Sequence, residues 1–363
     1  MKKFKILCCV TNDLSCDQRM QRICDSLAEW GYNVILFGRE LKHSFPLQTT
    51  SYSQKRVRCF FNKGKIFYAE YNIRLFFYLV RERPNVVHAV DLDTAPAVML
   101  ALLFFRLKIV YDAHELFTEV PEVVRRPAIR KIWHIIQQRF VPRANVVLTV
   151  SESIADYFRI NYNAQVYVVR NLPVLRPVMN KTRQRAIIYQ GALNEGRGLE
   201  ILIESMQYID AQLWIAGDGD ISEILKKLVE EYNLSFKVFF LGRLLPDELR
   251  EKTESAYIGY NVLEHKGKSY FYSLGNKTFD YIHAGIPQLI SPFPEMKRLN
   301  EQYAFAIEIQ EISTGKIIEA VNRLLNDSAL YEQLKNNCMA AKQVLNWQNE
   351  SSILKSAYER VLR

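Results

Sequence analysis

The sequence Ser269-Tyr-Phe-Tyr-Ser-Leu-Gly-Asn-Lys-Thr-Phe-Asp-Tyr-Ile-His-Ala-Gly-Ile-Pro-Gln-Leu-Ile-Ser291 contains, in order, a polar loop, a short helix, a glycine stop and a buried strand. Gly275, Asn276 and Lys277 place two flexible polar residues and one cation at the expected helix N-terminus, where backbone N–H groups favour a phosphate. Asp280 follows on the same face. A cation and a carboxylate at this spacing suit a diphosphate and a ribose, and an ordinary surface ion pair is the other interpretation.

Strands and helices alternate outward from this stretch in both directions. The apolar run Lys5–Val10 is typical of a parallel strand buried on both faces. Asp17 is expected to cap a helix that runs to about Trp30 and ends at Gly31. Such alternation predicts doubly wound parallel sheets of the α/β class. The other expected strands are Asn33–Phe37, Val86–Ala89, Lys108–Tyr111, Val146–Val150, Val166–Val169, Ala186–Tyr189, Gln212–Ala216, Lys237–Leu241, Tyr257–Val262 and Gln288–Ile290.

The length of 363 residues favours two domains. We expect the first domain at 1–172 and the second at 186–345. The intervening segment 173–185 has two prolines and no periodicity, which is typical of a linker. The longest apolar run, Ala95–Phe105, is too short to span a bilayer. Six cysteines without a CxxC pair indicate reduced, buried thiols in a cytoplasmic protein.

Positive charge is concentrated in the first half of the chain. Residues 1–172 contain 25 Lys and Arg against 15 Asp and Glu, whereas residues 173–363 contain 23 against 24. A net charge of +10 on one half indicates an anionic partner such as membrane lipid, nucleic acid or an acidic substrate. Residues 121–143 form a basic amphipathic pattern that suits a helix at a membrane surface, and a core-packed helix with a solvated basic face fits equally well.

Glycines and cations follow successive expected strands of the second domain. Gly191 and Arg197 follow the first strand, and a glycine there lets a phosphate approach the backbone while the guanidinium neutralises it. Gly217-Asp-Gly219 and Gly242-Arg243 follow the next two strands. Each segment alone fits ordinary turn chemistry. Their combination with Lys277 and Asp280 predicts a ligand site at the carboxyl edge of the sheet.

These motifs resemble the family 4 glycosyltransferases, which are retaining enzymes of the GT-B fold. The second half carries Tyr-Gln-Gly191 with Arg197-Gly198, Ile-Ala-Gly217-Asp-Gly219, Phe-Leu-Gly242, and Asn276-Lys277-Thr-Phe-Asp280. The first half carries Val10-Thr-Asn-Asp13, Asp17-Gln-Arg19, Val-His88-Ala-Val-Asp91 and Tyr-Asp-Ala-His114-Glu115. The resemblance implies two Rossmann-like domains facing a central cleft, with a C-terminal helix over 346–363 that completes the first domain.

The resemblance also assigns roles to individual residues. It implies catalytic roles for His114, Arg197 and Lys277, the two cations binding the donor diphosphate. Donor binding would involve Gly191, Arg197, Gly242, Arg243, Asn276, Lys277 and Asp280. The acceptor side would include Asp13, Asp17, Arg19 and Glu115, while His88 and Asp91 would brace the end of the first sheet. Two positions depart from the family pattern: Tyr272 stands where a glutamate is frequent, and Ala192 where an arginine is frequent.

The expected activity is front-face displacement of a nucleoside diphosphate with retention of configuration. The co-substrate would be a UDP- or GDP-sugar, and the acceptor a glycan or a lipid-linked molecule. No cofactor and no obligatory metal are expected, and we interpret Asp91-Leu-Asp93 as a helix cap. We expect a cytoplasmic protein, held at the anionic inner face of the plasma membrane by its basic first domain, that builds a surface polysaccharide such as lipopolysaccharide, or a glycolipid.

Two other functions remain open from the sequence. One is a nucleotide-sugar epimerase, which shares the GT-B architecture. A non-catalytic basic protein that binds lipid or nucleic acid would explain the charge of the first half. No motif for nucleic-acid binding is present, and no nucleic-acid partner is expected.

Overall fold

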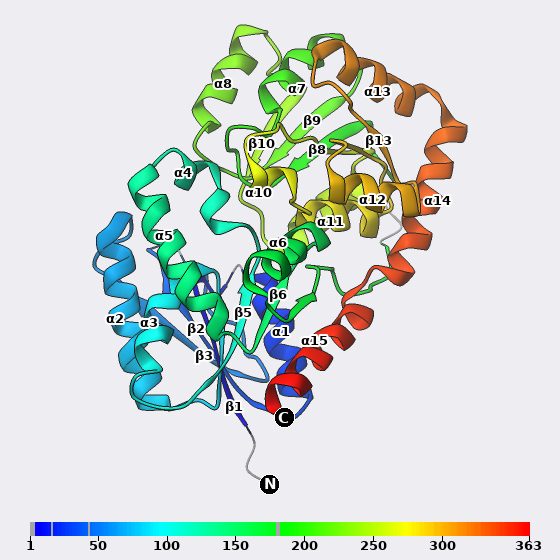
Figure 1. The fold of residues 1–363 in the computed structure, drawn as a ribbon. Coiled ribbons are helices and arrows are strands. Elements are labelled where there is room, and N and C mark those ends of the chain that lie inside the picture. The colour runs from blue at the N-terminus through cyan, green and yellow to red at the C-terminus, as the bar shows by residue number, and fades with distance from the viewer. Residues whose placement is uncertain (1–3, 16, 43, 179–181) are drawn as a thin grey trace. The chain divides into compact units, whose positions relative to one another are not determined.

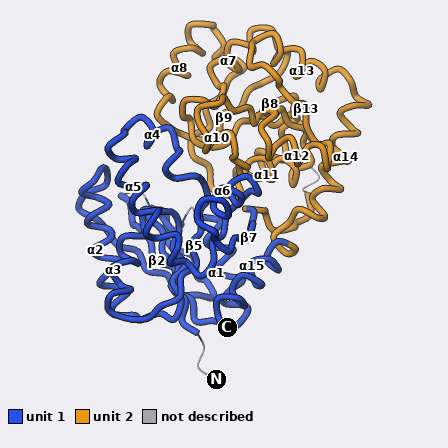
Figure 2. The backbone as a smooth tube through the Cα atoms, in the orientation of Figure 1, with its two compact units in different colours: residues 1–170, 350–363 blue, residues 171–349 orange. Residues whose placement is uncertain are grey.

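The computed structural model describes residues 4–15, 17–42, 44–178 and 182–363. It divides into two compact units, one formed by residues 1–170 and 350–363 and the other by residues 171–349 (Figure 2). Part of the expected linker 173–185, and Cys16, lie outside the described residues. Each unit is built on its own parallel sheet (Figure 1).

The sheet of unit 1 has seven parallel strands in the order β3-β2-β1-β4-β5-β6-β7. Its central strands are continuous apolar runs because both of their faces are covered, and the side chains of Ile6 to Val10 are completely buried. The strands are β1 (Lys5–Asp13), β2 (Asn33–Glu40), β3 (Ser53–Arg58), β4 (Val86–Val90), β5 (Lys108–Ala113), β6 (Val146–Thr149) and β7 (Val166–Val168).

Helices connect most of these strands. Asp17 caps α1 as predicted, since its carboxylate accepts a hydrogen bond from the Met20 N–H at 3.0 Å. The helices of unit 1 are α1 (Gln18–Glu29), α2 (Gly64–Glu82), α3 (Ala95–Ala101), α4 (Pro121–Val124), α5 (Pro127–Phe140), α6 (Glu152–Tyr162) and the main part of α15 (Trp347–Leu362). Short 3-10 turns are η1 (Leu92–Thr94), η2 (Phe117–Glu119) and η3 (Val141–Arg143).

The amphipathic segment 121–143 is not one helix. It is divided into α4 and α5 because Pro127, at the start of α5, keeps the preceding residue out of helical conformation. Trp133, Gln137 and Phe140 are buried, so α5 packs one face on unit 1, as the core-packed interpretation predicts. Its contact with a membrane stays a prediction.

The sheet of unit 2 has six parallel strands in the order β10-β9-β8-β11-β12-β13. They are β8 (Ala186–Gln190), β9 (Gln212–Ala216), β10 (Val238–Gly242), β11 (Ile258–Asn261), β12 (Gln288–Ile290) and β13 (Ala306–Glu308). The helices are α7 (Leu199–Ser205), α8 (Ser222–Glu231), α9 (Pro246–Ser255), α10 (Lys268–Phe271), α11 (Asn276–Ala284), α12 (Pro294–Tyr303), α13 (Thr314–Asn326) and α14 (Ser328–Val344), with the 3-10 turn η4 (Met206–Tyr208).

Both sheets reverse their strand order at one position. In unit 1 the reversal lies between β1 and β4, and in unit 2 between β8 and β11. Ligands of doubly wound sheets bind beyond the carboxyl ends of the strands at such a switch point. The topology therefore marks the ends of β1 and β4, and of β8 and β11, as the places to look for function. Within the described residues, no helix is both long and apolar enough to cross a membrane.

Candidate functional site

The carboxyl ends of β8 and β9 in unit 2 are joined by closely packed glycine backbones. Gly191 has φ 127° and Gly217 has φ 145°, which L side chains rarely adopt. A Cβ atom on Gly217 would lie 1.9 Å from the carbonyl oxygen of Gly191. The Gly191 N–H donates to the Ala216 carbonyl at 2.9 Å. Glycine is thus required at both positions, and the backbone is left bare where a ligand can approach it.

Lys277 is a buried cation in the first turn of α11. Its side chain projects from the helix N-terminus after Gly275, and its Nζ lies 4.0 Å from the centroid of the Tyr189 ring. Within the described residues Nζ has no hydrogen-bond partner. Burial, and then the charge of Arg197, hold the pKa of Lys277 well below its ordinary value. An ammonium group in this position is stabilised by an arriving anion.

Arg197 provides the second cation at this edge of the sheet. Its guanidinium lies 4.6 Å from the centroid of the Tyr270 ring, and its Nε is buried without a hydrogen-bond partner in the described part of the chain. Gly196 and Gly198 flank it with φ of 83° and 62°. The Tyr260 hydroxyl holds this loop by donating to the Gly198 carbonyl at 2.9 Å. Arg197 and Lys277 are near enough for their charges to interact, as binding of one polyanion requires.

Asp280 lies one turn further along α11 and is held by a polar chain. The Gln190 Nε2 donates to the Asp280 carboxylate at 2.7 Å, and the Thr253 hydroxyl donates to the Gln190 Oε1 at 2.8 Å. Among the described residues no ion pair joins Lys277 to Asp280, so the interpretation as a surface ion pair is wrong. Burial of the lysine on an aromatic ring separates the two charges.

The remaining donor-side predictions are more exposed. Asn276 and Arg243 are both exposed, and Gly242 has φ 64°. The Gly242 carbonyl accepts from the Gly217 N–H at 2.8 Å, which ties the end of β10 to the glycine pair of β8 and β9. Hydrogen bonds from Ser222 and Gly219, with a smaller effect of the Arg243 charge, lower the pKa of Asp218.

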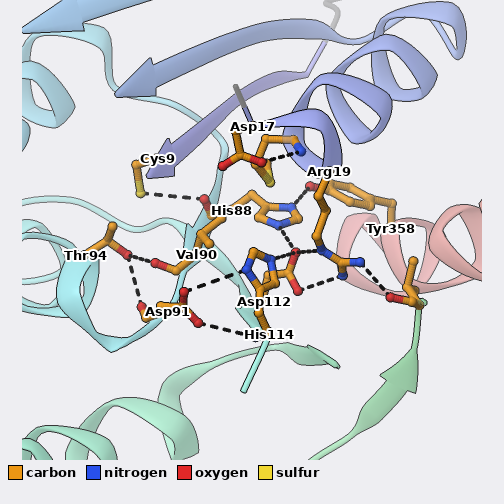
Figure 3. A network of polar contacts seen from close by, with 12 residues as sticks. Cys9, Asp17, Arg19, His88, Val90, Asp91, Thr94, Asp112, His114 and Tyr358 are labelled. Atoms are coloured by element: carbon orange, nitrogen blue, oxygen red, sulfur yellow. Dashed lines mark hydrogen bonds and ion pairs between the residues drawn. The ribbon is translucent and has the colours of Figure 1, made fainter. Parts of the chain in front are cut away.

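In unit 1, the switch point contains a buried carboxylate surrounded by three basic side chains (Figure 3). Asp112, at the end of β5, receives the Arg19 Nε at 3.0 Å and Nη2 at 2.9 Å. The His88 Nε2 lies 3.1 Å from the same carboxylate. Burial alone would raise the pKa of Asp112, but the charges of Arg19 and His114 hold it well below its ordinary value. Asp112 is therefore a fixed anion.

His88 connects this carboxylate to the C-terminal helix. Burial lowers the pKa of His88 despite its contact with Asp112, so the ring is neutral near pH 7. A carboxylate only accepts, so His88 donates from Nε2 and its Nδ1 accepts from the Tyr358 hydroxyl at 2.7 Å. Arg19 also donates to the Val169 carbonyl at 2.8 Å. Arg19, His88 and Tyr358 thus hold Asp112 in one orientation.

His114 lies between two carboxylates at the edge of the sheet. Its Nε2 is 3.3 Å from the Asp112 Oδ2, and its Nδ1 is 3.7 Å from the Asp91 Oδ2. Burial alone would lower the pKa of His114, but the carboxylates of Asp112 and Asp91 raise it to about 9. The ring is therefore an imidazolium near neutral pH, which suits a hydrogen-bond donor to a substrate oxygen and not a general base.

Asp91 adopts an unusual backbone conformation beside His114. Its φ of 54° and ψ of 175° are rare for any residue other than glycine. The Asp91 side chain accepts from the His114 N–H at 3.3 Å and makes no capping hydrogen bond, so the prediction that it caps a helix is wrong. Burial raises the pKa of Asp91. A strained acid that adjoins a charged histidine favours a functional role over simple bracing of the sheet.

The other acceptor-side predictions lie near the end of β1 or after β5. Asp13 accepts from the Ser15 N–H at 3.1 Å and lies 3.8 Å from Arg56, and Asp17 is occupied as the cap of α1. Glu115 is exposed. None of the described residues form a group of three or more His, Cys, Asp or Glu side chains arranged to hold a metal ion. The described cysteines are free buried thiols.

Four residues that organise these sites were assigned no role from the sequence. Tyr189 and Tyr270 support the two cations, Gln190 orients Asp280, and Tyr358 reaches His88. The end of β8, Tyr189-Gln190, did carry a signal, because large polar side chains at a strand end are directed to the ligand edge of the sheet. Tyr358 had none, because it lies 270 residues from its partner.

Two family models match nearly the whole chain. The model "Glycosyltransferase Family 4" matches residues 18–172, and the model "Glycosyl transferases group 1" matches residues 175–340. An uncharacterized glycosyltransferase of Methanocaldococcus jannaschii is 28% identical over 173 residues. That match covers 46% of this chain and 42% of the relative, so the chain aligns with less than half of the relative's length.

Solved structures share the architecture. Sucrose-phosphate synthase from Thermosynechococcus elongatus superposes with a TM-score of 0.84 at 17% identity, over 99% of both chains. HepE of Anabaena, solved in complex with UDP-glucose, superposes with a TM-score of 0.75 at 13% identity, over 98% of this chain and 99% of HepE. At such identities the likeness establishes the fold alone, and that fold is GT-B.

Proposed function

Since the chain belongs to the family 4 glycosyltransferases, we propose that it transfers a sugar from a nucleoside-diphosphate sugar to an acceptor hydroxyl with retention of configuration. The observation that carries this proposal is Lys277, a buried cation without a hydrogen-bond partner in the described residues, at a helix N-terminus and electrostatically coupled to Arg197. A buried, unpaired ammonium group lowers the stability of the folded chain, and a bound diphosphate would offset this loss of free energy.

The two cations would act mainly on the leaving group. When the bond between the anomeric carbon and the diphosphate oxygen breaks, negative charge accumulates on that oxygen. Lys277, Arg197 and the N–H groups at the start of α11 would stabilise this charge electrostatically. Asp280, oriented by Gln190, would accept hydrogen bonds from the ribose hydroxyls.

Retention follows from front-face displacement. The acceptor oxygen forms its bond to the anomeric carbon on the face that the diphosphate leaves, and its proton passes to the departing phosphate oxygen. This route requires no protein base, which agrees with the charged state of His114. In this proposal the His114 ring would donate a hydrogen bond to the transferred sugar. Residues Asp13, Asp17 and Glu115 remain candidates for the acceptor side, with Arg19 acting through Asp112.

We further propose a glycan or lipid-linked acceptor and a peripheral position at the cytoplasmic face of a membrane. The positive charge of residues 1–172 supports this part of the proposal, since anionic lipid attracts basic surfaces. The product would be a surface polysaccharide, for example lipopolysaccharide, or a glycolipid.

A thermal-shift screen across UDP- and GDP-sugars tests the donor, since a ligand that binds the folded state raises its melting temperature. We expect one nucleotide sugar to raise the melting temperature. The variant Arg197→Ala should bind that nucleotide sugar roughly 10- to 100-fold more weakly. The control is Arg185→Ala, an exposed cation near Asp210. Unchanged affinity in Arg197→Ala would refute the site.

Product analysis without acceptor separates the enzyme classes. A glycosyltransferase hydrolyses the donor slowly or leaves it intact, whereas an epimerase accumulates an isomeric sugar. Formation of the isomer in the absence of acceptor would overturn the proposed transfer reaction.

A further inference from the structure

Two neighbouring helices of unit 1 expose an unusual number of large apolar side chains. On α2, Ile66, Ile73 and Phe77 are 57%, 58% and 65% exposed. On α3 and the turn that follows it, Leu100, Leu103 and Phe104 are 43%, 78% and 66% exposed. We call these six residues the α2–α3 apolar face. Scattered exposed apolar residues are ordinary, but a contiguous group indicates an interaction surface.

Helix geometry and ring contacts make this group contiguous. Ile66, Ile73 and Phe77 are spaced by seven and four residues, so they project from one side of α2. Phe76 links the two helices, because its ring lies 5.4 Å from Phe77 and 5.4 Å from Phe104. Figure 1 shows α2 and α3 side by side in unit 1. The face therefore belongs to a single unit.

The charge around the face is almost entirely positive. Residues 55–83 and 95–108 contain ten Lys and Arg and only two acids, Glu70 and Glu82. Glu70 is occupied by Arg74 at 2.8 Å and by the N–H groups of Phe60 and Phe61, and Glu82 by Lys5 at 3.2 Å. Exposed cations that border the face are Lys63, Lys65, Arg81, Arg83 and Arg106.

We propose that the α2–α3 apolar face is the surface by which this chain lies on an anionic lipid membrane. Phenylalanine and isoleucine side chains enter the boundary between headgroups and acyl chains, while the surrounding cations contact lipid phosphates. The charge decides the occupant, since a second copy of this chain would oppose the same cations to one another. The inference rests on the proposed function, in which the acceptor is lipid-linked or made at a membrane.

The proposed membrane surface lies on other helices than the sequence suggested. Residues 121–143 suggested the membrane contact, but α5 buries Trp133 and Phe140 against unit 1, and Arg130 is paired with Glu119. Part of the apolar side of α5 is therefore used within the unit, while Ile132 and Ile135 are 53% and 38% exposed. Helix α2 differs, because it packs Phe67, Tyr71 and Leu75 into unit 1 and still exposes its residues of the α2–α3 apolar face on another side.

Vesicle sedimentation tests the inference, using phosphatidylglycerol–phosphatidylcholine vesicles against phosphatidylcholine alone. We expect the unaltered chain to bind the anionic vesicles preferentially, and the double variant Phe77→Ser with Phe104→Ser to bind at least ~10-fold more weakly. The matched control is Ile224→Ser with Phe236→Ser in unit 2, which removes two side chains that are 53% and 74% exposed. The control should bind vesicles like the unaltered chain.

A second variant, Arg81→Glu with Arg106→Glu, tests the cations without touching the apolar side chains. It should lose the preference for anionic vesicles. Equal binding by the unaltered chain and the Phe77/Phe104 variant overturns the inference, as does a concentration-dependent dimer that this variant abolishes. Nucleotide-sugar binding is measured on the same proteins: if it persists while vesicle binding fails, only the membrane surface is refuted, and its absence from the unaltered chain refutes the donor site.

Discussion

The switch points of the two units both contain buried charged side chains, but only in unit 1 is the buried charge compensated by the protein. In unit 1, the cations of Arg19 and His114, together with the His88 ring, surround the buried Asp112 carboxylate, so its charge is compensated within the protein. In unit 2, the charge of Arg197 acts on the buried Lys277, and no carboxylate among the described residues pairs with the lysine Nζ. The folds of the two sheets are alike, so this difference is due to side chains alone.

The difference indicates different roles. A balanced buried cluster is complete without a ligand, so it fixes the positions of the residues around it. An unbalanced cation lowers stability until an anion binds, which is typical of a binding site that has been arranged in advance. We therefore expect changes in unit 1 to act mainly on folding and on His114, and changes in unit 2 to act mainly on ligand affinity.

The largest effect is expected from Asp112→Asn. The change leaves the Arg19 guanidinium buried without a counter-charge, and breaking a buried ion pair in this way costs about 3–5 kcal/mol of unfolding free energy. Urea denaturation followed by circular dichroism measures it. The control, Asp156→Asn, removes an exposed partner of Arg159 and should cost less than about 0.5 kcal/mol. Similar losses in both variants would contradict the view that unit 1 depends on charge balance.

The next effect is expected from Lys277→Met, which retains the apolar stem. It should weaken nucleoside-diphosphate binding about 100-fold, or roughly 2.7 kcal/mol, and raise the stability of the unliganded chain by about 1 kcal/mol. Calorimetric titration with UDP or GDP and thermal unfolding measure the two quantities. Lys252→Met is the control, because its Nζ lies 3.2 Å from the centroid of the Trp214 ring outside the strand-end loops. A loss of stability in Lys277→Met would place this lysine among the structural residues.

The affinity for the nucleoside diphosphate should also depend on pH. The pKa of Lys277 is lowered in the unliganded chain, and a bound diphosphate raises it. Between these two pKa values binding takes up a proton, so affinity should fall as pH rises. Titrations in buffers of different ionisation enthalpy would show this uptake, and it should vanish in Lys277→Met.

The sequence was sufficient for the main architecture because parallel strands, helix caps and glycine stops are local signals. It missed β3 and β13, which are two of the four edge strands. The sequence of β3, SQKRVR, has no apolar run, because an edge strand is paired on one side only and is partly exposed. The three residues of β13 are too few to show a period.

The candidate sites were predictable only in part. Gly191, Arg197, Lys277 and Asp280 belong to motifs with recognisable spacing, and the structure brings Arg197 and Lys277 close enough for their charges to interact. The side chains that support them are determined by contacts between distant segments: Thr253 with Gln190 across 63 residues, and Gln190 with Asp280 across 90. Such contacts require the folded chain. For the same reason the burial that separates Lys277 from Asp280 was not foreseen.

His114 gives a smaller, pH-dependent test of the balanced site. Its folded pKa of about 9 lies above the ordinary histidine value of 6.5, so the folded chain holds the extra proton between these values. The resulting stability is complete below about pH 6.5 and is lost as pH rises through about 9. Since the ring is partly exposed and faces Asp91, Asp112 and Arg19, we expect a loss of about 1–2 kcal/mol.

Urea unfolding at pH 6.5, 8 and 9.5, together with NMR titration of the ring, measures this loss. His114→Gln should flatten the pH dependence. His134→Gln is the control, because the ring of His134 lies 3.8 Å from the carboxylate of Glu119, away from Asp112. A histidine resonance for His114 that titrates near pH 6.5 would remove the argument that it acts as a charged donor.

The smallest effect is expected from Tyr358→Phe, which tests whether α15 contributes to the balanced site. The change removes one hydroxyl and leaves the buried Nδ1 of His88 without its donor, at a cost of about 1 kcal/mol. Tyr32→Phe is the matched control, because the Tyr32 ring stacks 6.5 Å from Tyr358 but is partly exposed, and it should change stability by less than about 0.5 kcal/mol. If His88 positions Asp112, Tyr358→Phe should also shift the NMR titration of His114, whereas Tyr32→Phe should not. A loss of stability without that shift would mean that α15 only closes the core of unit 1 and has no influence on the histidine at its functional edge.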